Sequence, residues 1–426
     1  FWDGAAGPKA NGVVNGGDGV WQNSGGNDNW TEISGAINAA FSDSAFAIFA
    51  GAPGAVRVDD SLGAVTASGL QFASDGYVIG GDSIALVGPQ SVIRVGDGTA
   101  AGLGYTAAIN SALTGNSQLV KTDLGTLILN GTNSYTGGTR LNVGTLQISG
   151  DANLGDEAGG ISFDGGTLHS TASITSARNV DMIGTGTILT DAGTTLLFNG
   201  SVTGSGDLIK DGAGNLALND TSDYTGQTIV RAGGLFVNGD QSAATGLVDV
   251  AAGALLGGRG IIGGDVIVAD GGTLSPGDSP GTLTINGNLA LGSGSLLAFE
   301  FGEANVAGGA LNDLVNVGGD LVLDGTLNVA VSAGGSFGGG VYRVFNYGGT
   351  LTDNGLTLGT TPTGSELSVQ TAIAGQVNLV NTAGLTLNFW DGQAGPKNSG
   401  TIDGGNGIWR VAGNSNNWTE SAGQVN

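Results

Sequence analysis

Residues 119–148, LVKTDLGTLILNGTNSYTGGTRLNVGTLQI, decide the fold of this chain because the stretch occurs twice. Residues 208–237, LIKDGAGNLALNDTSDYTGQTIVRAGGLFV, align with it residue by residue at a constant offset of 89. The identical positions include Lys121 and Lys210 as well as most of the leucines and glycines. Self-similarity at a fixed spacing is typical of a repeat architecture.

Within each copy, leucines alternate with polar or small residues, and glycines recur every six or seven residues. A period of two places alternate side chains on one face of a strand, and glycine supplies the positive φ angles that corners need. One such unit cannot bury its apolar face alone, whereas coils stacked at about 4.8 Å bury one another's faces. The first copy therefore predicts three strands of a parallel β-helix, with inward side chains Leu127, Leu129, Leu141, Val143, Leu146 and Ile148.

The same alternation extends beyond the two copies. It begins near residue 56, where the predicted inward side chains are Val56, Val58, Val65, Leu70, Phe72, Val78, Ile84 and Leu86. Glycine makes up 85 of 426 residues without a collagen period, which suits short strands with a glycine at each corner. We therefore predict an all-β fold, a right-handed parallel β-helix (solenoid), over residues 50–388.

The repeated pattern L-[VI]-K-x₃-G-x-L-x-L-x₅-Y-T-G-x-T-x₄-G-x-L resembles the autotransporter-associated β-strand repeat. This repeat is found in passenger domains of bacterial proteins exported by type V secretion. Residues 69–86, 253–283 and 312–329 look like the same family. The resemblance implies an adhesin-type passenger at the bacterial cell surface, anchored to the outer membrane through a translocator barrel outside this fragment.

A second, longer repeat frames the chain. Residues 1–32 return at 389–420, offset by 388, with 18 of 32 positions identical. We expect a Trp-containing boundary or cap segment at 1–49 and the start of the next Trp-containing unit at 389–426. All six tryptophans lie in these two segments: Trp2, Trp21, Trp30, Trp390, Trp409 and Trp418.

These six tryptophans are the candidate ligand-binding residues, and two interpretations of them stay open. Indole faces stack on sugar rings, and Asp3, Asn29 and Asp391 would hydrogen-bond the hydroxyl groups of such a carbohydrate. Alternatively, the large aromatic side chains fill a joint or cap at the end of a solenoid, which small strand residues cannot close. Recurrence at a repeat boundary favours the second interpretation.

Charge and hydropathy exclude several classes of partner. The net charge of −24 repels phosphate backbones and anionic lipid, so nucleic acid is not expected as a partner. No apolar run approaches the roughly 20 residues of a membrane-spanning helix, so direct membrane insertion of this fragment is not expected. Residues 257–264, GGRGIIGG, lack the strand–loop–helix setting of a phosphate loop and are interpreted as corner glycines.

Catalytic chemistry finds little support. The adjacent acidic pairs are Asp59–Asp60 and Asp156–Glu157, and neighbours in a strand point to opposite faces. His169 is the only histidine, and we expect it to face outward. With no cysteine either, the sequence predicts no catalytic residues, no metal site and no cofactor.

The sequence therefore predicts a non-catalytic adhesin passenger that serves as stalk and binding surface for attachment to host cells or extracellular matrix. The expected partners are a host extracellular matrix protein or a host-cell glycan. One alternative is a self-associating passenger that binds sister passengers in bacterial aggregation or biofilm. A second is a polysaccharide-active β-helix enzyme, which would need several carboxylates and a cation in one groove.

Overall fold

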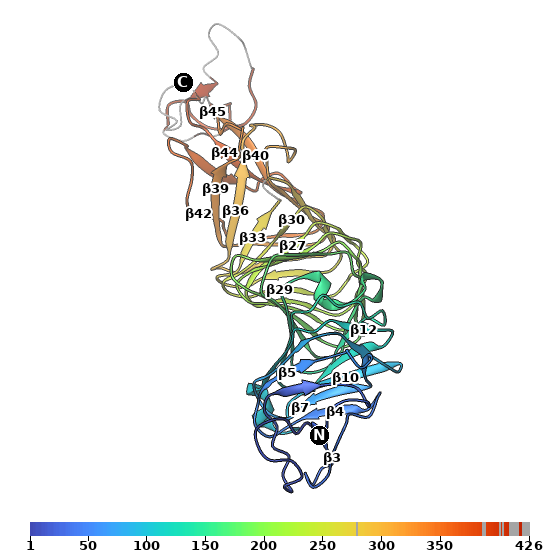
Figure 1. The fold of residues 1–426 in the computed structure, drawn as a ribbon. Helices are drawn as coiled ribbons and strands as arrows, with labels where there is room; N and C mark the ends of the chain where they lie inside the picture. The colour runs from blue at the N-terminus through green and yellow to red at the C-terminus, as the bar shows by residue number, and fades with distance from the viewer. Residues whose placement is uncertain (278–279, 386–388, 400–401, 403, 409–416, 420–426) are drawn as a thin grey trace.

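The computed structural model describes residues 1–426 except 278–279, 386–388, 400–401, 403, 409–416 and 420–426. Figure 1 shows an elongated column with the N-terminus at one pole and β45 (Phe389–Trp390) at the other. The described chain contains strands and three short 3₁₀ helices but no α-helix: η1 (Ala100–Gly104), η2 (Asp151–Leu154) and η3 (Glu157–Gly159). Among these residues, no helix has the length and apolarity needed to cross a membrane.

Each turn of the coil crosses three faces in a fixed order, which we call face 1, face 2 and face 3. Face 1 is one parallel sheet of 15 strands. Its strands are β1 (Gly19–Trp21), β5 (Ala55–Val58), β8 (Tyr77–Gly81), β11 (Thr106–Ile109), β14 (Thr126–Leu129), β16 (Thr145–Ile148), β18 (Thr167–Ser170), β21 (Gly186–Thr190), β24 (Leu208–Asp211), β26 (Thr228–Val230), β29 (Val248–Val250), β32 (Val266–Val268), β35 (Leu289–Leu291), β38 (Leu321–Leu323) and β41 (Leu351–Asp353).

Face 2 consists of two successive parallel sheets, one of three strands and one of nine. The first contains β6 (Val65–Ala67), β9 (Ile84–Leu86) and β12 (Leu113–Gly115). The second contains β19 (Ile174–Ser176), β22 (Thr195–Phe198), β25 (Asn215–Leu218), β27 (Gly233–Val237), β30 (Ala254–Gly258), β33 (Thr273–Pro276), β36 (Leu296–Phe301), β39 (Thr326–Val331) and β42 (Thr357–Leu358).

Face 3 is also divided, into sheets of eight and seven strands. The first contains β4 (Phe46–Phe49), β7 (Gly69–Phe72), β10 (Gln90–Val95), β13 (Gln118–Thr122), β15 (Thr139–Leu141), β17 (Ile161–Phe163), β20 (Val180–Met182) and β23 (Val202–Gly204). The second contains β28 (Asp240–Gln241), β31 (Ile261–Ile262), β34 (Thr282–Ile285), β37 (Leu314–Val317), β40 (Gly340–Tyr347), β44 (Gln376–Asn381) and β43 (Leu367–Gln370).

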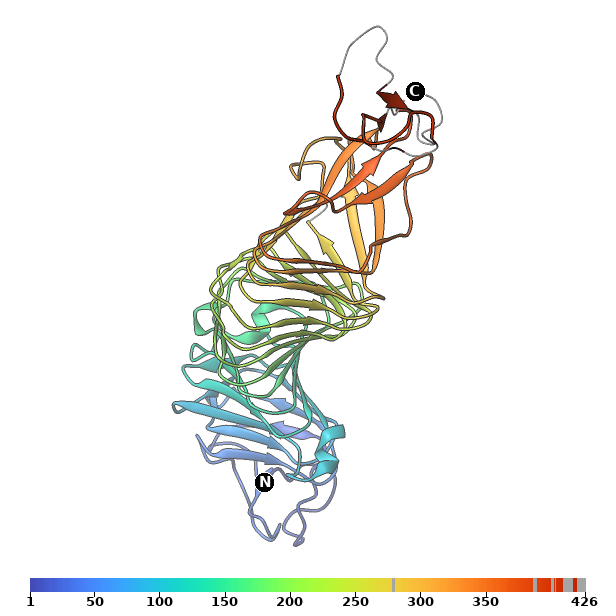
Figure 2. The ribbon, with the colours of Figure 1, turned by 180° about the vertical axis from the view of Figure 1, so that it is seen from behind.

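Successive coils stack along the column, as the ribbon in Figure 2 shows from behind, and their inward side chains lie in register. On face 1, Leu127 of β14 lies in register with Leu146 of β16, which lies in register with Leu168 of β18. All three are fully buried, whereas their outward neighbours are partly exposed. The all-β fold and the parallel β-helix are thus confirmed. Its right-handed sense, the usual hand of parallel crossover connections, stays a prediction.

Two predicted inward residues are wrong. Val78 is 38 % exposed because Tyr77 and Ile79, on either side of it in β8, take the inward positions, and a shift of one residue exchanges the two faces of a strand. The inward residues are Tyr77, whose hydroxyl donates to the carbonyl oxygens of Ala50 and Ala52, and Ile79. Val143 is 41 % exposed because β15 ends at Leu141 and Val143 lies on the following turn.

The two organising repeats lie on different faces. The first copy runs from β13 on face 3 to β14 on face 1, whereas the second runs from β24 on face 1 to β25 on face 2. The offset of 89 residues therefore corresponds to four turns plus one face. Repetition in sequence has placed the same motif one face further round the column.

Each copy also interrupts one face. Residues 130–138 of the first copy and 219–227 of the second form no strand, and they lie where the divisions of face 2 and face 3 occur. A buried tyrosine anchors each loop: Tyr135 hydrogen-bonds Thr139 at 2.6 Å, and Tyr224 hydrogen-bonds Thr228 at 2.7 Å. The aromatic ring thus fills the interior that strand side chains fill elsewhere.

A lysine is fully buried at the corner that opens each copy. Lys121 Nζ donates to the carbonyl oxygens of Thr122, Asp123 and Val143, at 2.9, 2.8 and 3.2 Å. Lys210 Nζ makes the equivalent three bonds to backbone carbonyls, at 2.7, 2.9 and 3.1 Å. Burial lowers the pKa of Lys121 to about 7 and that of Lys210 to about 8. The lysine ties its own corner to the corner of the next coil.

Glycine makes the approach of the two corners possible. Gly144 has a φ of 72°, and a Cβ there would come within 2.3 Å of the Asp123 carbonyl oxygen and 2.7 Å of Lys121 Nζ. The equivalent Gly233 has a φ of 64° and the same close approach to backbone. Only glycine combines this conformation with this lack of volume.

Both ends of the coil are closed by aromatic side chains. At the first end, the antiparallel pair β2 (Trp30–Thr31) and β3 (Asn38–Ala39) carries Trp30 over the first coils. At the other end, β44 and β43 add to β40 in antiparallel fashion, above stacked Phe301, Phe337 and Tyr342. A last antiparallel pair follows, β45 (Phe389–Trp390) and β46 (Trp418–Thr419). The predicted division at residues 49 and 388 stays a prediction.

Replacement of inward Leu127 by Asp is expected to lower the free energy of unfolding by about 3–5 kcal/mol, because the charge is buried without a partner. Replacement of exposed Asp223 by Asn should change it by less than about 0.5 kcal/mol. Thermal denaturation followed by circular dichroism compares the two. Equal destabilisation would contradict the assignment of inward and outward faces.

Lys210→Met keeps the volume of the side chain but leaves three corner carbonyl oxygens without their donor. We expect a loss of about 2–4 kcal/mol in the free energy of unfolding. Arg231→Met, an exposed cation in the same repeat, is the matched control and should lose little. Urea denaturation measures the free energy of unfolding of both variants. Equal values would contradict a structural role for the buried ammonium group.

Candidate functional site

The first three predicted ligand residues form one closed aromatic cluster at the start of the coil. Trp2 and Trp21 have no exposed surface, and Trp30 is 6 % exposed. The ring centroids of Trp2 and Trp30 are 5.3 Å apart and those of Trp21 and Trp30 are 5.2 Å apart, edge to face in both pairs. Phe41 and Phe49 complete the contacts. Edge-to-face packing of this kind is favourable beyond the burial of area.

The polar residues predicted to bind sugar hydroxyls are engaged within the protein. Asp3 is fully buried, and its carboxylate accepts hydrogen bonds from the backbone N–H of Asn15 and from Asn38 Nδ2 at 2.8 Å each. Asn29 Oδ1 accepts a hydrogen bond from Lys9 at 2.9 Å, and Lys9 also contacts the Asp3 carbonyl oxygen. The network fixes the chain crossing that carries Trp2.

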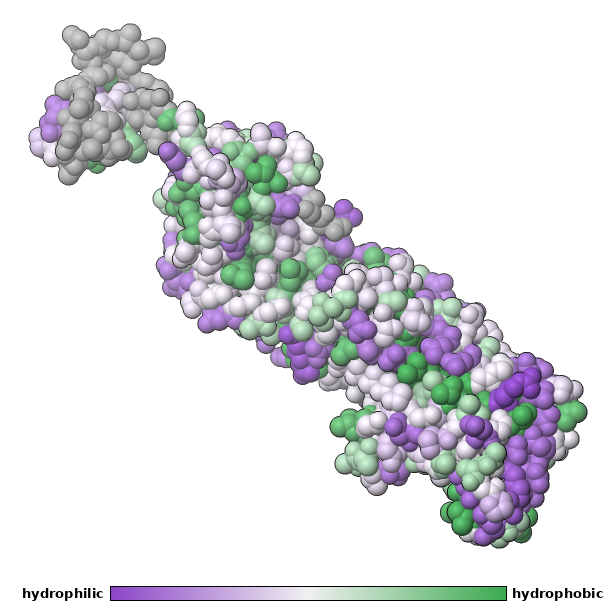
Figure 3. Space-filling view, turned by 60° about the vertical axis from the view of Figure 1, so that its left-hand side comes forward, coloured by the Kyte–Doolittle hydropathy of each residue, from purple (hydrophilic) through white to green (hydrophobic). Residues whose placement is uncertain are grey.

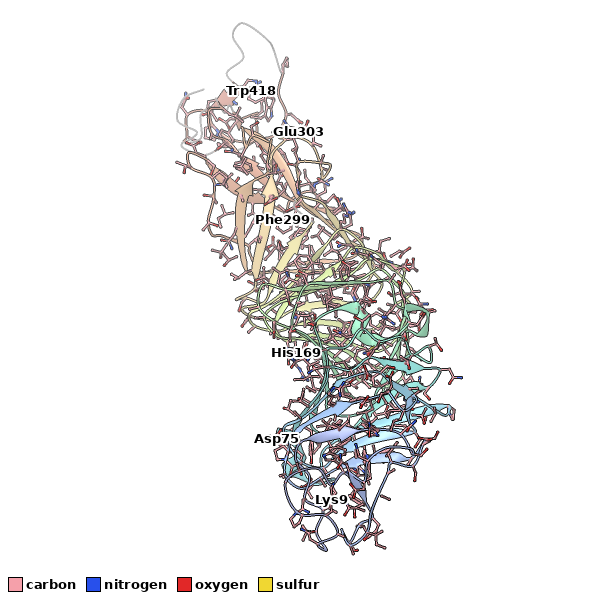
Figure 4. All side chains as sticks on the ribbon, viewed as in Figure 1. Lys9, Asp75, His169, Phe299, Glu303 and Trp418 are labelled. Carbon is pink, nitrogen blue, oxygen red and sulfur yellow. The ribbon has the colours of Figure 1, made fainter. Side chains whose placement is uncertain are left out.

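The second copy reproduces this local structure. Trp390 and Trp418 meet edge to face at 5.4 Å, and Trp390 Nε1 donates to the Gly405 carbonyl oxygen at 2.8 Å, as Trp2 Nε1 donates to that of Gly17. Asp391 is fully buried. Both tryptophans are half-buried, and Figure 4 shows Trp418 at the far pole of the column.

The remaining tryptophan of the second copy, Trp409, lies outside the described residues. A sugar needs an exposed indole face for stacking, and neither Trp2 nor Trp21 offers one. The packing therefore favours the cap interpretation for the first copy. Ligand binding through the tryptophans stays a prediction, and among the described ones Trp390 and Trp418 expose more of their surface than Trp30, which is 6 % exposed.

The acidic pairs and the single histidine lie apart from one another. Asp59 accepts a hydrogen bond from Gln22, and Asp156 caps η3 through the N–H of Ala158. His169 Nε2 lies 2.8 Å from Asp191 on the outer side of face 1, at the position labelled in Figure 4. His169 is thus outward and partly exposed, as expected.

Buried Arg178 has a structural role that the sequence did not indicate. Its guanidinium group donates to Asp151 Oδ1 at 2.9 Å and to the carbonyl oxygens of Gly155 and Asp156 at 2.6 Å each. These contacts hold the η2–η3 segment against the coil. In the part of the chain that the structure describes, no three metal-ligating side chains are grouped to hold an ion.

A groove on the outer side of face 2 was not expected from the sequence. It has a volume of about 280 Å³ and is lined by residues of β27, β33, β36 and β39. These strands belong to one sheet, in which β30 lies between β27 and β33, and all five are labelled in Figure 1. We call it the face-2 groove. The residues that matter for its chemistry are Phe236, Ser275, Ala298, Glu300, Asp313 and Asn328.

Asp313 is the buried polar group of the face-2 groove. It is 1 % exposed, and its two carboxylate oxygens accept hydrogen bonds from the N–H groups of Gly281 and Glu300 at 2.7 Å each. Burial, with a further contribution from the Glu300 carboxylate, raises the pKa of Asp313 to about 7 although the two amide bonds oppose the shift. Asp313 therefore carries a proton part of the time near neutral pH.

The face-2 groove escaped the sequence analysis because its residues are distant in the chain. Phe236 precedes Asn328 by 92 positions, and only coil stacking brings them together. One signal was available: Gly257 lies inside strand β30 at an outward position, paired with Phe236, and does not mark a corner. A glycine inside a strand often marks a close approach.

The titration of Asp313 links stability to pH. The folded chain keeps the proton up to about pH 7, whereas the unfolded chain loses it near the ordinary pKa of 3.8. Between these values the folded state binds more protons, so rising pH disfavours folding. Relative to Asp313→Asn, which does not ionise, the native chain should lose stability from pH 4 to pH 8.

Urea denaturation at pH 4, 5.5, 7 and 8.5 measures this difference between the two chains. The Asn variant also loses one hydrogen-bond acceptor, which adds a cost that does not depend on pH. A difference that is constant over the whole range would show that the buried carboxyl group titrates as an exposed one does.

Two comparisons with known proteins bear on this architecture. Residues 119–148 and 208–237 match the family described as Passenger-associated-transport-repeat. Over 188 residues, the chain is 56 % identical to the "Adhesin BmaC autotransporter" of Brucella suis biovar 1 (strain 1330). The aligned region is 44 % of this chain and 6 % of the Brucella protein, so the chain spans a small part of its relative's length.

Both matches are to proteins of the autotransporter class. The family match covers the two repeated motifs, each of which contains a buried lysine and a buried tyrosine. The relative is an adhesin of the autotransporter type. Both findings agree with the resemblance to autotransporter passengers that the repeated motif carries, and that resemblance is thereby confirmed.

Proposed function

We propose that this chain is a non-catalytic adhesin passenger that attaches a bacterium to host cells or to the extracellular matrix. The observation that carries the proposal is the identity of 56 % over 188 residues to an autotransporter adhesin. In this proposal the protein lies at the cell surface and is anchored to the outer membrane through a translocator barrel. Its partner is a host matrix protein or a host-cell glycan.

The physical form of the chain suits this role. A column of 15 stacked strands at about 4.8 Å extends over roughly 70 Å, which carries a binding surface away from the membrane. Buried columns of side chains make the column stiff. On the side shown in Figure 3, apolar residues occur in small separate groups among polar ones, which suits recognition through local sites.

Self-association is the second candidate function, and one observation favours it. Five outward threonines follow one another in register along face 1, from Thr106 through Thr126, Thr145 and Thr167 to Thr187. A flat, regular ladder of hydroxyl groups offers repeated hydrogen bonds to a like surface on a sister passenger. The net charge of −24 opposes close approach of two copies elsewhere.

A polysaccharide-active enzyme is less well supported by the geometry. The face-2 groove brings Glu300 and Asp313 together, but neither Lys nor Arg is among its described lining residues. Asp313 is held by two backbone amides and buried, which suits a structural or orienting carboxyl group better than a mobile acid. The proposal is therefore non-catalytic binding.

Beads coated with the purified chain should bind cultured host cells or immobilised matrix proteins with saturation, and soluble chain should compete. Sedimentation velocity on the same preparation should show a concentration-independent monomer. Beads coated with denatured chain, which has the same net charge, are the control for binding that depends on charge alone. Absence of saturable binding together with concentration-dependent dimers would replace host adhesion by self-association as the function.

A further inference from the structure

We infer that the face-2 groove is a binding subsite for one neutral or amino sugar ring of a glycan. The inference deepens the adhesin proposal and rests on it for the source of the glycan. The argument for the site itself comes from the floor, the aromatic wall, the free polar atoms and the charge of the groove.

The floor of the groove is made of small outward residues. Along face 2, Phe236 pairs with Gly257, and Gly257 pairs with Ser275. Further along, Ala298 pairs with Asn328. Ser275 and Ala298 line the groove with short side chains, and Gly257, against the Phe236 ring, adds no side chain of its own. The volume of about 280 Å³ is close to the lower end of the ~300–1,000 Å³ typical of small-molecule sites, which suits a single ring.

Phe236 supplies an aromatic wall, and two glycines set its position. A Cβ at Gly234 would come within 2.8 Å of the ring, and one at Gly257 would come within 3.1 Å. The ring therefore lies against backbone and stays partly exposed. An exposed aromatic ring is an apolar surface on which the C–H face of a pyranose ring can pack.

Two polar groups of the groove are available to a ligand with hydroxyl groups. Asn328 Oδ1 accepts hydrogen bonds from the N–H and hydroxyl of Thr360 at 2.9 Å each, which fixes the side-chain amide. Among the described residues, neither Asn328 Nδ2 nor Ser275 Oγ has a hydrogen-bond partner. A fixed amide donor and a hydroxyl group beside an aromatic ring are the groups that orient a sugar.

The charge of the groove selects the class of sugar. Glu300 and Asp313 both line it, and neither Lys nor Arg does so among the described residues. The two carboxyl groups make the groove acidic, which repels the carboxylate of a uronic or sialic acid and attracts an ammonium group. Asp313 contributes only to this charge, because both of its oxygens already accept backbone N–H groups. Neutral hexoses, N-acetylhexosamines and hexosamines therefore fit, and acidic sugars do not.

Saturation-transfer-difference NMR and calorimetry with the whole chain test the site. The probes are methyl β-galactoside, N-acetylglucosamine and glucosamine, with glucuronic acid and N-acetylneuraminic acid as acidic counterparts. We expect binding of at least one of the first three and at least tenfold weaker binding of the acidic pair. Phe236→Leu, which keeps an apolar side chain but removes the ring face, should weaken binding at least tenfold.

Two further variants make the result specific. Ser275→Ala removes only a hydroxyl group and should weaken binding about threefold or more. Ile267→Ala alters an apolar side chain on face 1 that is 41 % exposed, and it should leave binding unchanged. Circular dichroism and thermal denaturation verify that each variant folds before its binding is compared.

The inference is overturned if none of the sugars binds at millimolar concentration, if Phe236→Leu binds as the native chain does, or if the acidic sugars bind more tightly. The bead assay separates this outcome from the adhesin proposal. Loss of sugar binding in Phe236→Leu with cell adhesion retained leaves adhesion standing on another surface. Absence of adhesion in the native chain, with sugar binding intact, keeps the subsite and removes the adhesin function.

Discussion

The structure depends on the in-register stacking of inward side chains from one coil to the next. Leu127, Leu146 and Leu168 show the principle, since each lies directly above the next in a parallel sheet and none is exposed. A single coil has no interior of its own, so the hydrophobic effect stabilises the fold only through contacts between neighbouring coils. The column must therefore be closed at both ends, which the tryptophan cluster and the antiparallel strands β43 and β44 achieve.

Where a coil lacks its third strand, the repeated motif fills the interior and joins that coil to the next. A buried tyrosine occupies the interior under the loop, and a buried lysine joins two corners through three carbonyl oxygens. The lysine bonds backbone carbonyl oxygens and the tyrosine hydroxyl bonds a threonine of the same motif, so the motif works on any face. The second copy can therefore lie one face further round the column than the first.

Recognition is left to the outer positions, where packing imposes little. Face 1 carries a ladder of threonines, and face 2 carries a hollow where glycine, serine and alanine follow one another beside Phe236. Because each coil contributes one residue to any such surface, a site combines residues that are about 20 apart in the chain. A stiff column can thus change its binding surface without a change in its core.

The all-β parallel coil, the inward positions of most apolar residues and the two repeats could be predicted from the sequence, because period-two alternation and glycine spacing are local properties. The outward positions of Val78 and Val143 could not, since they depend on how the coil turns at corners such as those held by Tyr77 and Lys121. Only the tertiary structure decided that Trp2 and Trp21 are buried, because their contacts come from residues 41 and 49. The face-2 groove likewise could not be predicted from the sequence, because it exists only where several coils are stacked in register.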